Sequence, residues 1–112
     1  MTPDETSQLS DLVELRNIDD LWTAVRFCAE LARRETEPAP FATIQAILQE
    51  IGTTWESEPV SAEAFDRVTA ELVPEMRRLI AAPSAEAAAA LFRVWTRLKQ
   101  EHPLVPPYRP MQ

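Results

Sequence analysis

The sequence predicts an all-α fold, a compact antiparallel bundle of four to five helices followed by an extended, proline-rich C-terminal tail. Apolar residues recur at spacings of three and four through most of the chain, and no stretch alternates polar and apolar residues as a half-buried strand does. The chain has 112 residues, 46% of them hydrophobic, which suits a single domain with one core. We therefore expect one helical domain over residues 1–102 and a tail over residues 103–112.

The chain contains one glycine, one cysteine and one histidine. Phosphate-binding loops and nucleophile elbows need glycines where φ is positive or where a ligand approaches the backbone closely. Metal sites and acid–base relays usually combine several histidines or cysteines. The composition therefore favours a non-enzymatic protein, and we expect neither a cofactor nor a bound metal ion.

The first two helices are predicted from the residues that open them. Thr2 precedes Pro3 and stands three residues before Glu5, which is the pattern of a capping box. Asn17 occupies the same capping position before the second helix. This helix ends before Pro38, because the residue before a proline avoids helical backbone angles.

The third helix is expected from about Pro40 to Ile51. Gly52 directly follows its last apolar position, where a left-handed residue would close the helix. Residues 53–60 are mostly polar and are predicted to form a loop.

The last two helices each begin at a serine cap. Ser61 opens the fourth helix, whose apolar spacing stays in phase across Pro74, so we expect one kinked helix. Ser84 opens the fifth, which continues to about Glu101. The predicted core is Leu21, Val25, Ile44, Leu48, Phe65, Leu72, Leu79, Leu91 and Trp95.

The formal net charge of −7 argues against direct binding of nucleic acid, which depends on lysines and arginines that neutralise phosphates. Residues 1–60 carry a net charge of −8 and residues 61–112 a net charge of +1. This polarity serves solubility or presents an acidic face to a partner with a basic surface.

The predicted location is the cytoplasm. No apolar run reaches the roughly 20 residues of a membrane helix, and the polar, acidic N-terminus is unlike a signal peptide. One cysteine cannot form an internal disulfide. Ten arginines against one lysine, with 16 alanines, are typical of a GC-rich bacterial genome.

Several reactive residue types are predicted to have structural roles. Cys28 lies on the apolar side of the second helix and should be buried. His102 falls near the end of the fifth helix, where a cation complements the helix dipole. Glu71 and Glu75 share one helix face, but no Glu-x-x-His pair accompanies them as in di-metal bundles.

The candidate partner-binding residues are Trp55, Leu104, Val105, Tyr108 and Arg109. A tryptophan in a polar loop either folds back onto the core or anchors a partner. The tail combines apolar residues with prolines, so it either packs along its own bundle or reaches a partner or a second subunit. A homo-oligomer is possible.

These observations support three hypotheses of function. The first is a small acidic, non-catalytic accessory or regulatory protein that acts through protein–protein contacts. The second is an acidic inhibitor or immunity-type protein that blocks a basic, nucleic-acid-binding site on its target. The third is a small helical enzyme or ligand-binding bundle that binds an anionic substrate through arginines, for which the candidates are Arg16, Arg26, Arg77, Arg78, Arg93 and Arg97.

Overall fold

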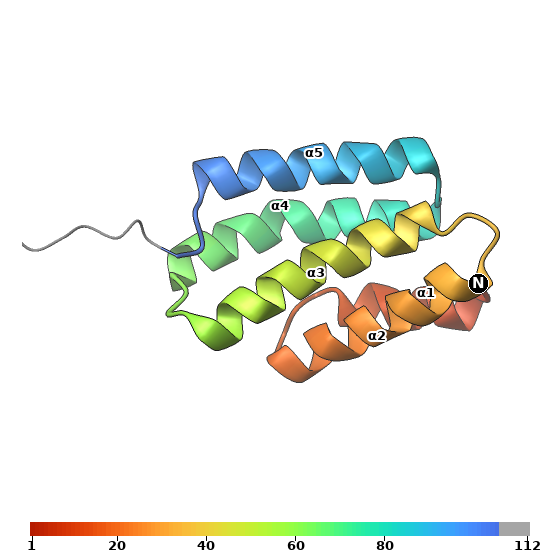
Figure 1. Ribbon diagram of the computed structural model, residues 1–112, viewed down its shortest axis with the longest axis horizontal. Helices are drawn as coiled ribbons and strands as arrows, with labels where there is room; N and C mark the ends of the chain where they lie inside the picture. The colour runs from red at the N-terminus through yellow and green to blue at the C-terminus, as the bar shows by residue number, and fades with distance from the viewer. Residues whose placement is uncertain (106–112) are drawn as a thin grey trace, which may run out of the picture.

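Five α-helices make up the regular structure of residues 1–105, which are the residues that the computed structural model describes (Figure 1). They are α1 (Pro3–Leu12), α2 (Ile18–Arg34), α3 (Ala39–Ser57), α4 (Ala62–Ala81) and α5 (Ala85–Glu101). No strand occurs in this part of the chain. The predicted all-α class is therefore confirmed.

Four of the helices begin with the predicted side-chain caps. The Glu5 amide donates to Thr2 Oγ1 at 3.2 Å and the Thr2 amide donates to Glu5 Oε1 at 3.0 Å, which completes the capping box. Asn17, Ser61 and Ser84 each accept a hydrogen bond from the amide three residues later. A cap stabilises a helix by about 1 kcal/mol, so these four starts are encoded locally.

α3 lies in the middle of the molecule (Figure 1). It packs most extensively against α2 and also contacts α5 and α4, whereas α1 packs on α2 and α4. Consecutive helices alternate in direction along the chain (Figure 1). The five helices form a compact globule, and a regular antiparallel bundle with an extended tail stays a prediction.

One apolar core joins all five helices. Every predicted core residue except Phe65 is buried. Phe65 is only partly buried, because it lies in the first turn of α4, where its ring contacts Trp55 near the surface. A core shared by all five helices explains why the helical spacing was visible along the whole sequence.

The predicted end of the third helix was wrong. α3 continues to Ser57, so Gly52 lies inside the helix and does not have a positive φ. A Cβ atom on Gly52 would lie 2.6 Å from Leu21 Cδ2 and 2.9 Å from Trp22 Cζ2. Gly52 is therefore a point of close approach between α2 and α3, and the predicted loop shortens to the few residues before α4.

α4 passes through Pro74 without interruption, as predicted from its apolar spacing. Proline lacks an amide hydrogen, so the carbonyl of Ala70 loses its helical donor. Both residues are exposed, which leaves that carbonyl accessible to water. The proline is tolerated because it lies on the outer face of the helix.

The connection between α1 and α2 contains a strained residue that the sequence did not indicate. Leu15 has a φ of 59°, a left-handed conformation that costs a non-glycine residue roughly 1–2 kcal/mol. Its side chain is buried, and burying a leucine stabilises a protein by about 1.5–3 kcal/mol. Burial therefore offsets the backbone strain.

Candidate partner-binding site

The described part of the tail, residues 103–105, lies against the globule where α3 ends and α4 begins. The Ser61 amide donates to the carbonyl of Leu104 at 2.8 Å, and the Leu104 side chain packs against the core. Leu104 and Val105 line one side of a cavity of about 220 Å³ whose other side includes Thr54 and Trp95. We call residues 103–105 the tail root.

Trp55 lies in the last turn of α3, not in a loop as predicted. Its ring is partly buried and contacts Phe65, with ring centroids 4.9 Å apart and planes tilted by 56°. Because Thr54, the preceding residue, shares a cavity with Leu104 and Val105, the structure brings three of the predicted partner-binding residues to the same end of the molecule. Tyr108 and Arg109 lie outside the described residues.

A polar cluster forms the floor of this region between α3 and α5. Trp95 Nε1 donates to Glu50 Oε2 at 2.6 Å, and Lys99 Nζ lies 3.1 Å from Glu50 Oε1. The Lys99 ammonium also lies 5.3 Å from the centroid of the Trp95 ring. The indole is almost fully buried while its N–H still has a partner, so this cluster fixes the position of α5 beside the tail root.

Four carboxylates gather where α2 begins and α3 ends. Asp19 and Asp20 lie in the first turn of α2, and Glu56 and Glu58 lie at the end of α3. The two helix ends are joined by Trp22, whose Nε1 donates to Glu56 Oε1 at 2.6 Å. We call these four residues the acidic end; none of them forms an ion pair within residues 1–105.

The helix dipole separates the four acids into two groups. Asp19 and Asp20 stabilise α2, because the N-terminus of a helix carries partial positive charge. Glu56 and Glu58 face the negative end of α3, and no basic residue lies in its last turn. Each such placement costs roughly 0.3–1 kcal/mol at low ionic strength. Helix stability therefore gives no account of the two charges; the bond from Trp22 explains an acceptor at position 56, but an uncharged glutamine would also provide one.

The arginines do not form a cationic pocket in the described part of the chain. Arg16 and Arg77 line one cavity of about 460 Å³, but Glu14, which pairs with both, and Asp66 line it too, so two acids offset the two bases. Arg78 pairs with Glu75. Arg97 bridges two further acids, Glu71 on α4 and Glu101 on its own helix. Arg26 and Arg93 lack an ion pair within residues 1–105, and they lie on different helices, α2 and α5.

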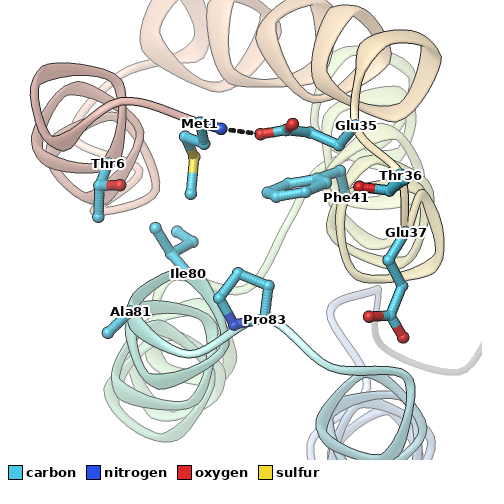
Figure 2. Close-up of a pocket in the computed structure, with 9 residues that line it drawn as sticks. All are labelled: Met1, Thr6, Glu35, Thr36, Glu37, Phe41, Ile80, Ala81 and Pro83. Carbon is cyan, nitrogen blue, oxygen red and sulfur yellow. Dashed lines mark hydrogen bonds and ion pairs between the residues drawn. The ribbon is translucent and has the colours of Figure 1, made fainter.

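A second cavity, of about 340 Å³, lies where α2 and α4 end and α3 and α5 begin, which is the opposite end of the helices from the tail root. Figure 2 shows the residues that line it. The Met1 side chain points into it beside Phe41 and Ile80, and the Met1 ammonium pairs with Glu35 (Figure 2). Glu37 turns away and accepts a hydrogen bond from the Ala85 amide at 3.0 Å, at the start of α5. The charged groups at this cavity are therefore already engaged within the chain.

Cys28 and His102 have the structural positions expected of them. Cys28 is buried, and desolvation raises the pKa of its thiol to about 12, so the thiol is neutral near pH 7. His102 is the C-cap of α5, with its amide donating to the Leu98 carbonyl at 2.8 Å. No group of three or more metal-binding side chains occurs within residues 1–105.

None of the helices in the described range is both long and apolar enough to cross a membrane. Comparisons with protein-family models, with curated proteins and with solved structures find no match to this chain. The functional argument therefore depends on the residues of this chain alone.

Proposed function

We propose that this protein is a small acidic, non-catalytic accessory or regulatory protein that binds a partner protein in the cytoplasm through the acidic end and the neighbouring tail root. The observation that carries the proposal is the placement of Glu56 and Glu58 at the negative end of α3 without a basic residue in the last turn. Because these charges lower the stability of α3, we infer that they have a role outside the helix, in binding. A basic surface on a partner would supply that role.

The proposed contact has an apolar anchor beside its charges. Trp55 is adjacent to Glu56 in α3 and keeps part of its ring accessible. Tryptophan is enriched among the residues that dominate binding energy, and a surrounding polar rim excludes water from such an anchor. In this arrangement, Leu104 and Val105 add apolar surface from the tail root, and the four carboxylates speed association with a basic partner.

The first experiment identifies the partner and then measures the binding of the purified protein to the purified partner. Captured proteins from a lysate of the native host are identified by mass spectrometry with the wild-type chain as bait. For the identified partner, we expect Trp55→Ala to raise the Kd and Glu56→Gln/Glu58→Gln to lower the association rate about tenfold. The matched control is Asp4→Asn/Asp11→Asn, which removes the same charge from α1 and should change neither constant.

The test needs a truncation that preserves the fold. Cutting after Glu101 removes the Leu104 carbonyl bonded to Ser61 as well as the packing of Leu104. Cutting after Val105 keeps both and removes only residues 106–112. Unchanged binding by the chain cut after Val105 would exclude residues 106–112 from the contact. Unchanged binding by Trp55→Ala and by Glu56→Gln/Glu58→Gln, with far-UV circular dichroism unchanged, would contradict the proposed surface.

A second candidate, the acidic inhibitor or immunity-type protein, is favoured by the same four carboxylates. A protein that imitates the charge of nucleic acid should bind its basic target with a steep dependence on salt. We expect the logarithm of the Kd to rise with the logarithm of salt concentration, and the slope to fall in Asp19→Asn/Asp20→Asn. A flat salt dependence excludes this candidate and also excludes the acidic end from the contact proposed for the accessory role.

The third hypothesis, arginine-based recognition of an anionic substrate, receives the least support. Four of the six candidate arginines pair with glutamates, and the other two are on separate helices. Anion binding would require these ion pairs to break.

A further inference from the structure

α5 has a second stripe of small or apolar side chains on an exposed face, about a third of a turn around the helix from its buried face. Phe92 is 55% exposed and is the one large hydrophobic side chain that residues 1–105 leave at the surface. Ala85, Ala89 and Thr96 are also exposed and stand with Phe92 at spacings of four, three and four. This is the spacing of the contact positions in a two-helix coiled coil.

Two opposite charges follow this stripe on one flank. Glu86 comes directly after Ala85, and Arg93 directly after Phe92, so both project from the same side of α5 two turns apart. Neither forms an ion pair within residues 1–105. The positions three and four residues from Arg93 hold alanine, threonine and arginine, and those around Glu86 hold only alanine and proline. Neither charge therefore has an opposite partner on its own helix.

The stripe and its charges are complementary to a second copy of themselves. When two α5 helices pack antiparallel about a twofold axis near Ala90, Glu86 of one copy lies opposite Arg93 of the other, and this pairing occurs twice. Phe92 then faces Ala89 of the other copy, a large residue against a small one. Equivalent flanks meet in an antiparallel pair, and a twofold interface must be self-complementary in this way.

The overall charge of the molecule also favours this helix for contact with a second copy. The protein carries −7, so two copies repel each other over most of their surfaces. α5 is the only one of the five helices with a net positive charge, from Arg93, Arg97 and Lys99 against Glu86 and Glu101. A basic partner, by contrast, would be repelled by this helix.

We propose that the outer face of α5 is a homodimer interface in which two copies of the chain pack antiparallel through Phe92 and Ala89 and exchange Glu86–Arg93 ion pairs. One helix face from each copy lies at the low end of the size range for specific interfaces. The dimer is therefore weak and concentration-dependent, with a Kd between about 1 μM and 1 mM.

Analytical ultracentrifugation of the full chain tests the proposal, from about 10 μM to about 1 mM so that the expected Kd range is covered. The wild type should change from a mass near 12.7 kDa towards twice that value as concentration rises. Phe92→Ala should raise the Kd about tenfold or more, because it removes the large apolar contact at the centre of the interface. Arg26→Ala, on α2 at an arginine without an ion pair within residues 1–105, is the control and should leave the Kd nearly unchanged.

A charge exchange tests the antiparallel register. Arg93→Glu places carboxylates opposite each other, and Glu86→Arg places guanidinium groups opposite each other, so each single variant should weaken the dimer about fivefold or more. The double variant Glu86→Arg/Arg93→Glu restores opposite charges and should return the Kd to within about threefold of the wild-type value. All these positions are exposed, and circular dichroism verifies that the variants keep their helices.

Three results would each overturn the proposal: a monomeric wild type at about 1 mM, a dimer whose Kd does not respond to Phe92→Ala, or a folded double variant that stays as weak as the single ones. These results are independent of the proposed partner binding, which depends on Trp55 and the acidic end. A protein that dimerises and binds no partner, or binds a partner as a monomer, separates the two proposals.

Discussion

α3 has two main neighbours and contacts them in opposite ways. On the side of α2 it presents Gly52, where the missing side chain lets Leu21 and Trp22 approach its backbone. On the side of α5 it presents Glu50, which receives the indole N–H of the buried Trp95 and the ammonium of Lys99. The first contact depends on close approach, and the second depends on one large side chain and a polar cluster at its edge. The two sides should therefore respond differently to mutation.

The largest effect is expected on the side of α5. Trp95→Ala removes an almost fully buried indole and leaves a cavity between α3 and α5, which should lower the free energy of unfolding by about 3–5 kcal/mol. Urea denaturation followed by circular dichroism measures the loss. Phe92→Ala on the same helix is the control and should change stability by less than about 0.5 kcal/mol, because Phe92 is exposed. A loss below about 1 kcal/mol for Trp95→Ala would show that α5 is held by other contacts.

The second effect concerns the side of α2. Gly52→Ala introduces a methyl group into occupied space, which typically lowers the free energy of unfolding by about 1–3 kcal/mol. The higher helix propensity of alanine raises it by about 1 kcal/mol. We expect a net loss of up to about 2 kcal/mol in the same denaturation experiment. The neutral, buried thiol of Cys28 should also react faster with a thiol reagent, because loosening α2 exposes it.

A double-mutant cycle shows whether close approach is the cause. In a Leu21→Ala background the nearest obstructing atom is gone while Trp22 Cζ2 remains, so the cost of Gly52→Ala should fall without disappearing. An equal cost in both backgrounds would mean that Gly52 is needed for another reason.

A smaller effect is expected at the polar edge of the α5 contact. Lys99→Met removes both the ion pair with Glu50 and the cation–π contact between the ammonium and the Trp95 ring. Lys99 and Glu50 are both partly exposed, so the loss should be at most about 1 kcal/mol and should shrink at high salt. A loss as large as that of Trp95→Ala would reverse the view that the indole, not the charge, secures α5.

The smallest effect lies outside α3, in α1. The backbone hydrogen bond from Thr2 and the contact with Arg34 lower the pKa of Glu5 from 4.5 to about 2. A carboxyl with a lowered pKa stabilises the folded state fully above pH 4.5, and this contribution is lost as pH falls towards 2. NMR titration should give the low pKa directly. Glu5→Gln should lose stability at neutral pH and be less sensitive to pH between 4.5 and 2 than the wild type.

The helix starts could be predicted because their signals are local. Each cap is a hydrogen bond between residues three positions apart, so Thr2, Asn17, Ser61 and Ser84 reveal it in the sequence. The end of α3 could not be predicted in the same way. A glycine after an apolar residue has the same sequence appearance whether it closes a helix or allows a neighbouring helix to approach.

The candidate site was predicted only in its parts. The sequence singled out Trp55, Leu104 and Val105. It placed the tryptophan in a loop, however, and gave no reason for it to lie at the same end of the molecule as the tail root. The bond between Ser61 and Leu104 joins these segments and spans 43 positions of the chain. Glu56 and Glu58 interact unfavourably with the negative end of the α3 dipole. This interaction can be recognised only once the helix is known to extend to Ser57.

The sequence alone determined the helical class, the helix starts and most of the core, because spacing and capping act over a few residues. Tertiary structure decided which helices adjoin and which charges meet. Arg77 pairs with Glu14 across 63 positions and Arg97 with Glu71 across 26, and no local pattern contains those distances. It also decided the role of Gly52, because a close approach is a property of two helices together.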